Sequence, residues 1–170
     1  TKVRSDNATL DVTTEWWELI APDTGTANLV ITCTGSIDIT AFAFSLTGVN
    51  QTTMSEASNG SSTTSATPSV SVTSVTNDAW LFTVLASQSP VVSANHHYAI
   101  GVPLLDQSFE NAMACIRPYK TAAGATSMAY DISASNEWAI TGVAVKPVVV
   151  AAGGTAVKDP VGIGIIPYAR

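Results

Sequence analysis

Charged residues are scarce in this 170-residue chain, where they make up 12% of the sequence, against roughly 25% in a typical soluble domain. Seven Lys and Arg residues stand against thirteen Asp and Glu, which gives a formal net charge of −6. The basic residues are scattered along the chain, so no basic stripe is present to neutralise phosphates. The composition therefore argues against nucleic-acid binding.

Long uninterrupted apolar runs are also missing. The most apolar stretch, residues 140–152, is broken by Lys146 and Pro147. It is shorter than the roughly 20 residues that a membrane-spanning helix needs. We therefore expect no membrane insertion.

Cysteine and histidine are too few for a familiar metal site. Cys33 and Cys115 have no clustered histidines around them, and the adjacent His96 and His97 would point to opposite faces of a strand. The eight Asp residues are dispersed, whereas calcium needs clustered oxygens. We expect no metal and no cofactor. For Cys33 and Cys115 two alternatives remain open, namely two buried free thiols or one disulfide between sheets.

Several features of enzymes are absent as well. The chain has no G-x-S-x-G nucleophile elbow, and its paired glycines lack the lysine and helix of a phosphate loop. Glu15 and Glu18 flank two tryptophans, as carboxylates do in some glycosidases. On a strand, however, residues three positions apart face opposite sides. We predict that the protein is not an enzyme and has no catalytic residues.

The features that the sequence does have are abundant hydroxyl side chains and short apolar runs. The chain contains 22 Thr and 18 Ser and is 46% hydrophobic, so a core can form, and Thr favours pleated, half-wet surfaces. Apolar and polar residues alternate over short stretches separated by turn residues, which is typical of sandwiches and barrels. The fold class we predict is an all-β antiparallel sandwich of jelly-roll or immunoglobulin-like shape, with very little helix.

The pattern predicts strands at residues 15–21, 27–34, 38–48, 69–75, 79–86, 97–103, 112–119, 126–133 and 137–146. The strand at 38–48 is apolar on both faces, which favours a central position. Residues 51–67 are dominated by Ser, Thr, Asn and Gly and are predicted to form a long exposed loop. Residues 69–75 and 79–86 are predicted to pair as a hairpin.

Residues 1–147 are assigned to the sandwich domain, and residues 148–170 to an extended C-terminal tail. The tail is apolar and glycine-spaced, and it needs a covering surface. It either packs on its own sandwich or docks on a neighbouring subunit as an added strand. The predicted contact residues are Val161, Ile163, Ile165, Ile166 and Tyr168.

Four short segments together resemble a β-sandwich module of bacterial secreted proteins and tailed-phage structural proteins. Residues 17–25 resemble its W-x-L-x-x-P-x-x-G segment, residues 27–32 its partner strand, residues 46–53 its F-x-G-V-D-Q-T-T turn, and residues 138–147 its closing strand. The aspartate of the turn is Asn50 here. Such modules usually carry further strands upstream, which are dispensable here or supplied by a cleaved piece or another subunit. The resemblance implies a sandwich at a virion surface or outside the cell.

Three functions are compatible with these features. The first is a non-enzymatic component of a tailed-phage virion, such as a capsid decoration or fibre protein, whose partners are its own copies and a major capsid protein. The second is a subunit of an extracellular filament or surface layer that exchanges strands with its neighbour. The third is a carbohydrate-binding or adhesion module that uses an exposed tryptophan. Trp16 and Trp17 are the candidate contacts for a ligand or partner, although alternation places one of them in the core.

Overall fold

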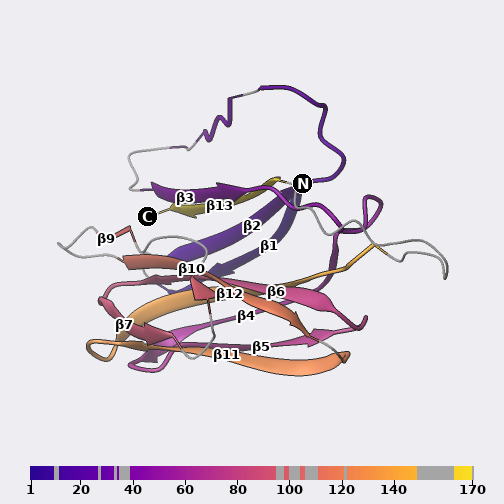
Figure 1. Ribbon diagram of the computed structural model, residues 1–170. Coiled ribbons are helices and arrows are strands. Elements are labelled where there is room, and N and C mark those ends of the chain that lie inside the picture. Colours follow the sequence, from indigo (N-terminus) through magenta and orange to yellow (C-terminus); the bar gives the residue numbers. More distant parts are fainter. Residues whose placement is uncertain are drawn as a thin grey trace.

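The computed structural model describes residues 1–9, 12–26, 28–32, 34, 39–94, 98–99, 104–105, 111–120, 122–148 and 163–169, the strands at 98–99, 104–105, 111–120 and 163–169 by their backbone. This part of the chain contains strands and no helix, and every strand pair is antiparallel. The strands form stacked sheets (Figure 1). The predicted antiparallel β-sandwich is confirmed.

The upper sheet in Figure 1 has four strands. In spatial order they are β1 (Lys2–Asn7), β2 (Thr13–Leu19), β13 (Ile163–Ala169) and β3 (Ile39–Phe44). The last strand of the sequence therefore lies between two early ones. Its backbone pairs from Ile163 opposite Leu19 on β2 to Ala169 opposite Ile39 on β3.

The middle sheet contains the most deeply buried strands. Its order is β4 (Ser55–Ser65), β12 (Asn136–Val145), β6 (Ala79–Ser87), β10 (Asn111–Lys120) and β8 (Tyr98–Ala99), with β9 (Leu104–Leu105) also paired to β10. Nearly every residue of β6 and β12 is buried, because layers cover both faces of this sheet.

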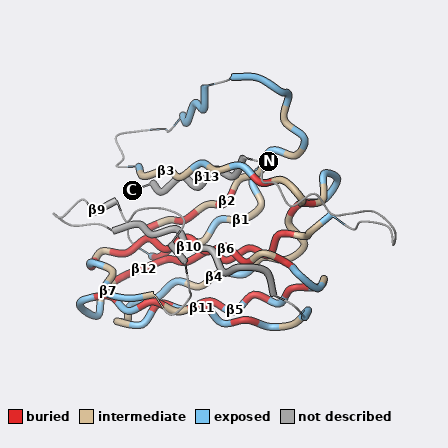
Figure 2. The backbone as a smooth tube through the Cα atoms, viewed as in Figure 1, coloured by how far each residue is buried: buried red, intermediate tan, exposed pale blue. Residues whose placement is uncertain are grey.

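The lower sheet has three strands: β5 (Ser69–Ser74), β11 (Gly124–Ile132) and β7 (Val91–Ala94). Along β5 each buried residue alternates with an exposed one, so one face packs inward and the other meets water. The tube in Figure 2 shows buried residues concentrated along the strands of the middle and lower sheets.

Apolar side chains fill both spaces between the sheets. Between the middle and lower sheets lie Val70, Val72, Leu81, Leu85, Met128, Tyr130 and Ile140. Between the middle and upper sheets lie Trp16, Phe82, Val84, Val143 and Val145. Gly142 on β12 allows the lower sheet to approach, since a Cβ at this position would lie 2.6 Å from Cγ2 of Val72.

Several strand predictions hold. The strands predicted at 112–119, 126–133 and 137–146 are present with shifts of one or two residues at their ends. The first predicted strand, 15–21, lies two residues earlier as β2. In the strand predicted at 69–75, Val70 and Val72 are buried as expected, but Val75 lies beyond the strand end and is exposed.

The predicted loop at 51–67 is wrong. Residues 55–65 form β4, which pairs with β12 along nearly its whole length. The ladder uses backbone groups, and β4 is the edge strand of its sheet, so it can carry polar side chains that no apolar pattern reveals.

Three other predictions are corrected. The segment at 27–34 is not a strand over its described residues, because nothing pairs with it. The strand within 38–48 lies at a sheet edge, with no described strand beyond it. Residues 69–75 and 79–86 do not form a hairpin, since the turn before β6, where Asp78 has φ +59°, carries the chain into a different sheet.

Candidate functional site

The two adjacent tryptophans of β2 have opposite environments. Trp16 is fully buried, with its ring centroid 5.7 Å from that of Phe44 and 5.4 Å from that of Phe82. Trp17 lies on the other face of the strand, half-buried, where its Nε1 donates a 2.8 Å hydrogen bond to Glu15. The prediction of Trp16 as a ligand or partner contact is therefore corrected, since strand alternation makes it a core residue. Trp17 remains accessible.

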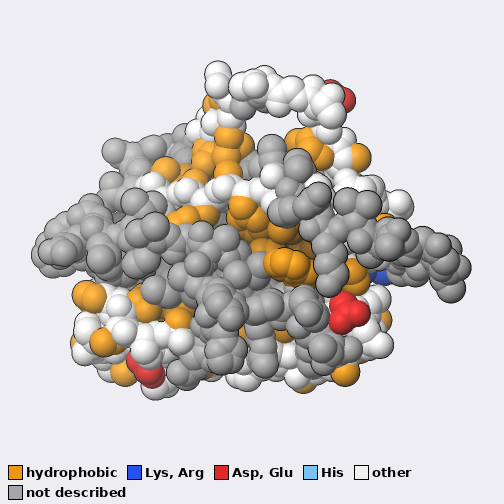
Figure 3. Space-filling view, in the orientation of Figure 1, with side chains coloured by type: hydrophobic (Ala, Val, Ile, Leu, Met, Phe, Trp, Pro, Cys, Tyr) orange, Lys and Arg blue, Asp and Glu red, His pale blue; other side chains and the backbone are white. Residues whose placement is uncertain are grey.

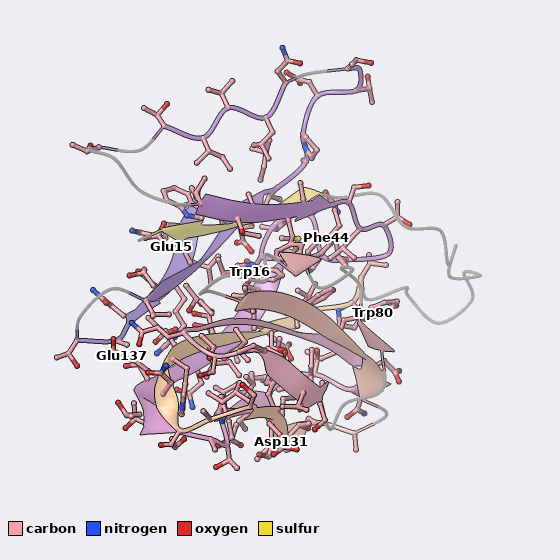
Figure 4. All side chains as sticks on the ribbon, turned by 90° about the vertical axis from the view of Figure 1, so that its left-hand side faces the viewer. Glu15, Trp16, Phe44, Trp80, Asp131 and Glu137 are labelled. Atoms are coloured by element: carbon pink, nitrogen blue, oxygen red, sulfur yellow. The ribbon has the colours of Figure 1, made fainter. Side chains whose placement is uncertain are left out.

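Glu15 is the centre of a small polar cluster on the outer face of the β1–β2 pair (Figure 4). It accepts hydrogen bonds from Lys2 Nζ at 2.8 Å, from Ser5 at 3.2 Å and from Trp17, and the Lys2 ammonium lies 5.3 Å from the Trp17 ring centroid. Glu18 faces the other way and accepts a bond from Ser55. The two carboxylates do not form a pair across a cleft.

The pKa of Glu15 reflects two opposing effects. Burial by itself raises it, but the hydrogen bonds from Lys2 and Trp17 and the charge of Lys2 lower it, so that it lies below its ordinary value of 4.5. A carboxylate with a lowered folded-state pKa stabilises the fold above the unfolded-state pKa. That contribution disappears as pH falls through the folded-state pKa.

We expect the variant Glu15→Gln to lose less stability on acidification than the wild type, because it lacks this titrating group. Urea unfolding midpoints at about pH 6 and about pH 3 measure the difference. Asp23→Asn is the control, since it removes one negative charge at an exposed position. An identical acid response of Glu15→Gln and wild type would contradict the assignment.

A buried ionic network connects the upper and middle sheets. Arg4 donates two 2.7 Å hydrogen bonds to the carboxylate of Asp6, whose side chain is only 10% exposed. Asp6 also accepts a bond from Thr141 on β12, and the hydroxyl of Thr141 lies 2.9 Å from that of Thr14 on β2. A Cβ at Gly60 on β4 would overlap the Asp6 carboxyl group at 2.0 Å. Position 60 must therefore be glycine, so that the Asp6 carboxylate can lie against the backbone of β4.

A second buried carboxylate has no cation beside it. Glu137, the second residue of β12, is 7% exposed; its Oε1 accepts a 3.2 Å bond from Thr9 Oγ1, and its Oε2 has no partner in the described part of the chain. Both ion pairs within the described residues, Lys2–Glu15 and Arg4–Asp6, involve other carboxylates. An unsatisfied buried acceptor costs about 1–3 kcal/mol, and more when charged.

A polar groove lies next to this carboxylate. It encloses about 390 Å³ and is lined by residues from the end of β1 and the turn after it and by residues of β4: Asn7, Ala8, Thr9, Ser62, Thr63 and Thr64. Thr9 both lines the groove and binds Glu137, and Thr64 lies directly opposite Glu137 in the β4–β12 ladder. Figure 4 shows Glu137 near the turn between β1 and β2.

An exposed apolar segment, residues 28–32, arches over the upper sheet; we call it the arch (Figure 1). Leu29 is 46% exposed, Val30 77% and Ile31 36%. None of the hydrogen bonds recorded among the described residues involves the arch backbone. Figure 3 shows further hydrophobic side chains on the body of the molecule below the arch, and few acidic or basic ones on that face.

The turn at residues 46–53 anchors the end of the long strand β12. Asn50 Oδ1 accepts hydrogen bonds from the backbone amides of Thr52 and Thr53 at 2.9 and 2.8 Å, and its own amide donates to Lys146 O. An asparagine carbonyl accepts the same two bonds as an aspartate carboxylate, so Asn50 serves this turn equally well.

Some predicted residues lie outside what the structure describes. Cys33, His96, His97 and Val161 are among them, and Cys115 is described only by its backbone, opposite Thr83 on β6. Of the tail residues, Ile163, Ile165, Ile166 and Tyr168 belong to β13, which pairs with strands of its own chain.

The described residues contain no cluster of three or more histidine, cysteine or acidic side chains that could hold a metal ion. Among them there is also no helix long and apolar enough to cross a membrane.

No protein-family model, curated protein or solved structure matches this chain. The site must therefore be interpreted from its own residues. Sequence reasoning missed Asp6, Gly60 and Glu137, because nothing in their local pattern marks them. Arg4 and Asp6 do stand two positions apart, which places them on one face of a strand.

Proposed function

We propose that the protein is a non-enzymatic structural component that assembles with its own copies and with a major capsid or filament protein. The observation that carries the proposal is the arch. Residues 28–32 combine β-forming, apolar side chains with an exposed backbone that makes no hydrogen bond among the described residues. Such a segment is stabilised when a partner covers its side chains and pairs with its backbone.

The exposed apolar side chains of the arch are unfavourable in a monomer surrounded by water. Burying one valine or leucine side chain contributes about 1.5–3 kcal/mol, and three consecutive residues of this kind are available there. Leu19 and Ile39, at the ends of β2 and β3, add exposed apolar surface to the same sheet. An interface that covers this sheet would bury all of them.

The setting we propose is the surface of a tailed-phage virion, where the protein would serve as a capsid decoration or fibre protein. The low charge, the hydroxyl-rich polar faces and the resemblance of residues 46–53 to a turn of phage structural modules support this setting. Of the two tryptophans proposed as contacts, Trp16 is buried and Trp17 alone is accessible, so a carbohydrate-binding role has less support.

The test is Val30→Asp, which places a charge in the centre of the arch. We expect the variant to lose self-association and binding to capsids or filaments of the source, as measured by sedimentation. Its unfolding free energy should change by no more than about 0.5 kcal/mol, because the site is exposed.

Val75→Asp is the matched control, since Val75 is similarly exposed, at 70%, but lies next to the lower sheet. It should assemble like the wild type. Normal assembly of Val30→Asp would overturn the proposal.

Strand exchange with a neighbouring subunit is the second candidate mechanism, because of the position of β13. This strand comes last in the sequence yet lies between β2 and β3, and residues 149–162 separate it from the rest of the described chain. A terminal strand that fills an internal slot can be donated to the same slot of another copy. Such donation would build a filament or surface layer.

A further inference from the structure

Glu137 is an uncompensated carboxylate within the described part of the chain. The residue is 7% exposed, and its Oε2 has no hydrogen-bond partner among the residues that the structure describes. Among the described residues the single donor to the side chain is the Thr9 hydroxyl, at a long 3.2 Å. A native core normally supplies a charged carboxylate with several donors or a cation. The missing donors indicate a ligand.

The adjoining groove has the chemistry of a cation site. Its side-chain oxygens come from threonine, serine and asparagine, and its described lining includes no lysine or arginine. A buried negative charge acts through low-dielectric surroundings, so it attracts a cation more strongly than a solvated charge does. Neutral oxygen acceptors around it can then receive the cation's hydrogen bonds.

We propose that this groove binds a primary ammonium group, with Glu137 as the counter-ion. An ammonium carries one positive charge and three donors, which fits one carboxylate plus neighbouring hydroxyl and amide oxygens. A calcium ion takes six to eight oxygens and tight sites use several carboxylates, whereas the described lining of the groove contains no carboxylate and Glu137 lies behind its wall residue Thr9. The ammonium belongs to a free amine or to a lysine side chain of another protein.

The position of Thr9 explains how the ligand reaches the carboxylate. Thr9 lies in the turn between β1 and β2 and forms part of the groove wall, with its hydroxyl on Glu137. Rotation of this side chain would free Oε1, the carboxylate oxygen that its hydroxyl binds, and would leave the hydroxyl available as an acceptor. Thr64, which lies directly opposite Glu137 in the β4–β12 ladder, also lines the groove.

The test is titration of the full chain with 1,4-diaminobutane, with a lysine-containing peptide, and with calcium chloride, monitored by amide chemical shifts. We expect both amines to shift the signals of Thr9 and Thr64. The tighter of the two identifies the source as a free amine or a protein side chain. Glu137→Gln should weaken the amine binding by at least about tenfold, while Asp23→Asn, which removes one exposed charge, should bind like the wild type.

If Glu137 served only to stabilise the fold, Glu137→Gln would unfold at a lower urea concentration than the wild type. The proposal predicts otherwise. Without ligand, we expect Glu137→Gln to unfold at an equal or higher urea concentration than the wild type, because it removes an uncompensated buried charge. A lower midpoint, an absence of amine-induced shifts, or equal amine binding by variant and wild type would each overturn the proposal. Calcium binding that displaces the amines at lower concentration would also overturn it.

Discussion

Replacing Trp16 by alanine is expected to lower the free energy of unfolding by about 3–5 kcal/mol, a large share of the roughly 5–15 kcal/mol that a domain possesses. Trp16 is fully buried and contacts both Phe44 of the upper sheet and Phe82 of the middle sheet. Its loss leaves a cavity where those sheets meet (Figure 4). Denaturant unfolding followed by circular dichroism measures the change.

Two matched variants test whether the cost of Trp16→Ala comes from the loss of a buried ring. Trp16→Phe should cost much less, because it keeps an aromatic ring and removes the indole Nε1, which is buried and has no hydrogen-bond partner among the described residues. Trp17→Ala should cost only about 1 kcal/mol, the loss of a partly exposed hydrogen bond and cation–π contact. Equal costs for Trp16→Ala and Trp17→Ala would contradict the assignment of Trp16 to the core.

Removal of residues 149–170 is expected to detach β3 and open the upper sheet. Among the described strands, β3 pairs only with β13, and β2 would keep only β1. Loss of β3 also removes the partly buried Phe44 from its ring contacts with Trp16 and Phe82, which further weakens the packing between the upper and middle sheets. Hydrogen exchange should show lost protection in β2 and β3 and retained protection in β6 and β12, where the middle sheet stays covered by the lower one.

A peptide of residues 161–170 added in trans should restore this protection, and a scrambled peptide of the same composition should not. The truncated chain also tests assembly by strand exchange. In strand exchange it can accept a strand but donate none, so small amounts should shorten filaments of the full chain. Unchanged protection of β2 and β3 after truncation would contradict the pairing of β13.

Some features of the candidate sites can be predicted from neighbouring residues in the sequence, whereas others depend on contacts between distant parts of the chain. Alternation along residues 13–19 was enough to separate Trp16 from Trp17, because successive side chains of any strand face opposite sides. Glu137 and Asp6 could not be recognised in advance. Their partners Thr9, Thr141 and Gly60 are far from them in sequence and come together only when the sheets stack.

By itself the sequence determined the all-β class and the placement of Trp16 and Trp17 on opposite faces of their strand, since these depend on composition and on a two-residue period. The pairing of strands in three dimensions decided which other segments joined the sheets and in what order. The polar residues 55–65 became a strand because β12 offered a ladder, whereas the apolar residues 28–32 remained outside the sheets because no described strand lies beside them. The place of β13 between β2 and β3 was also a tertiary outcome. Backbone hydrogen bonds form the sheets, and backbones are alike in every residue but proline, so the choice of partner depends on which surfaces pack together in three dimensions.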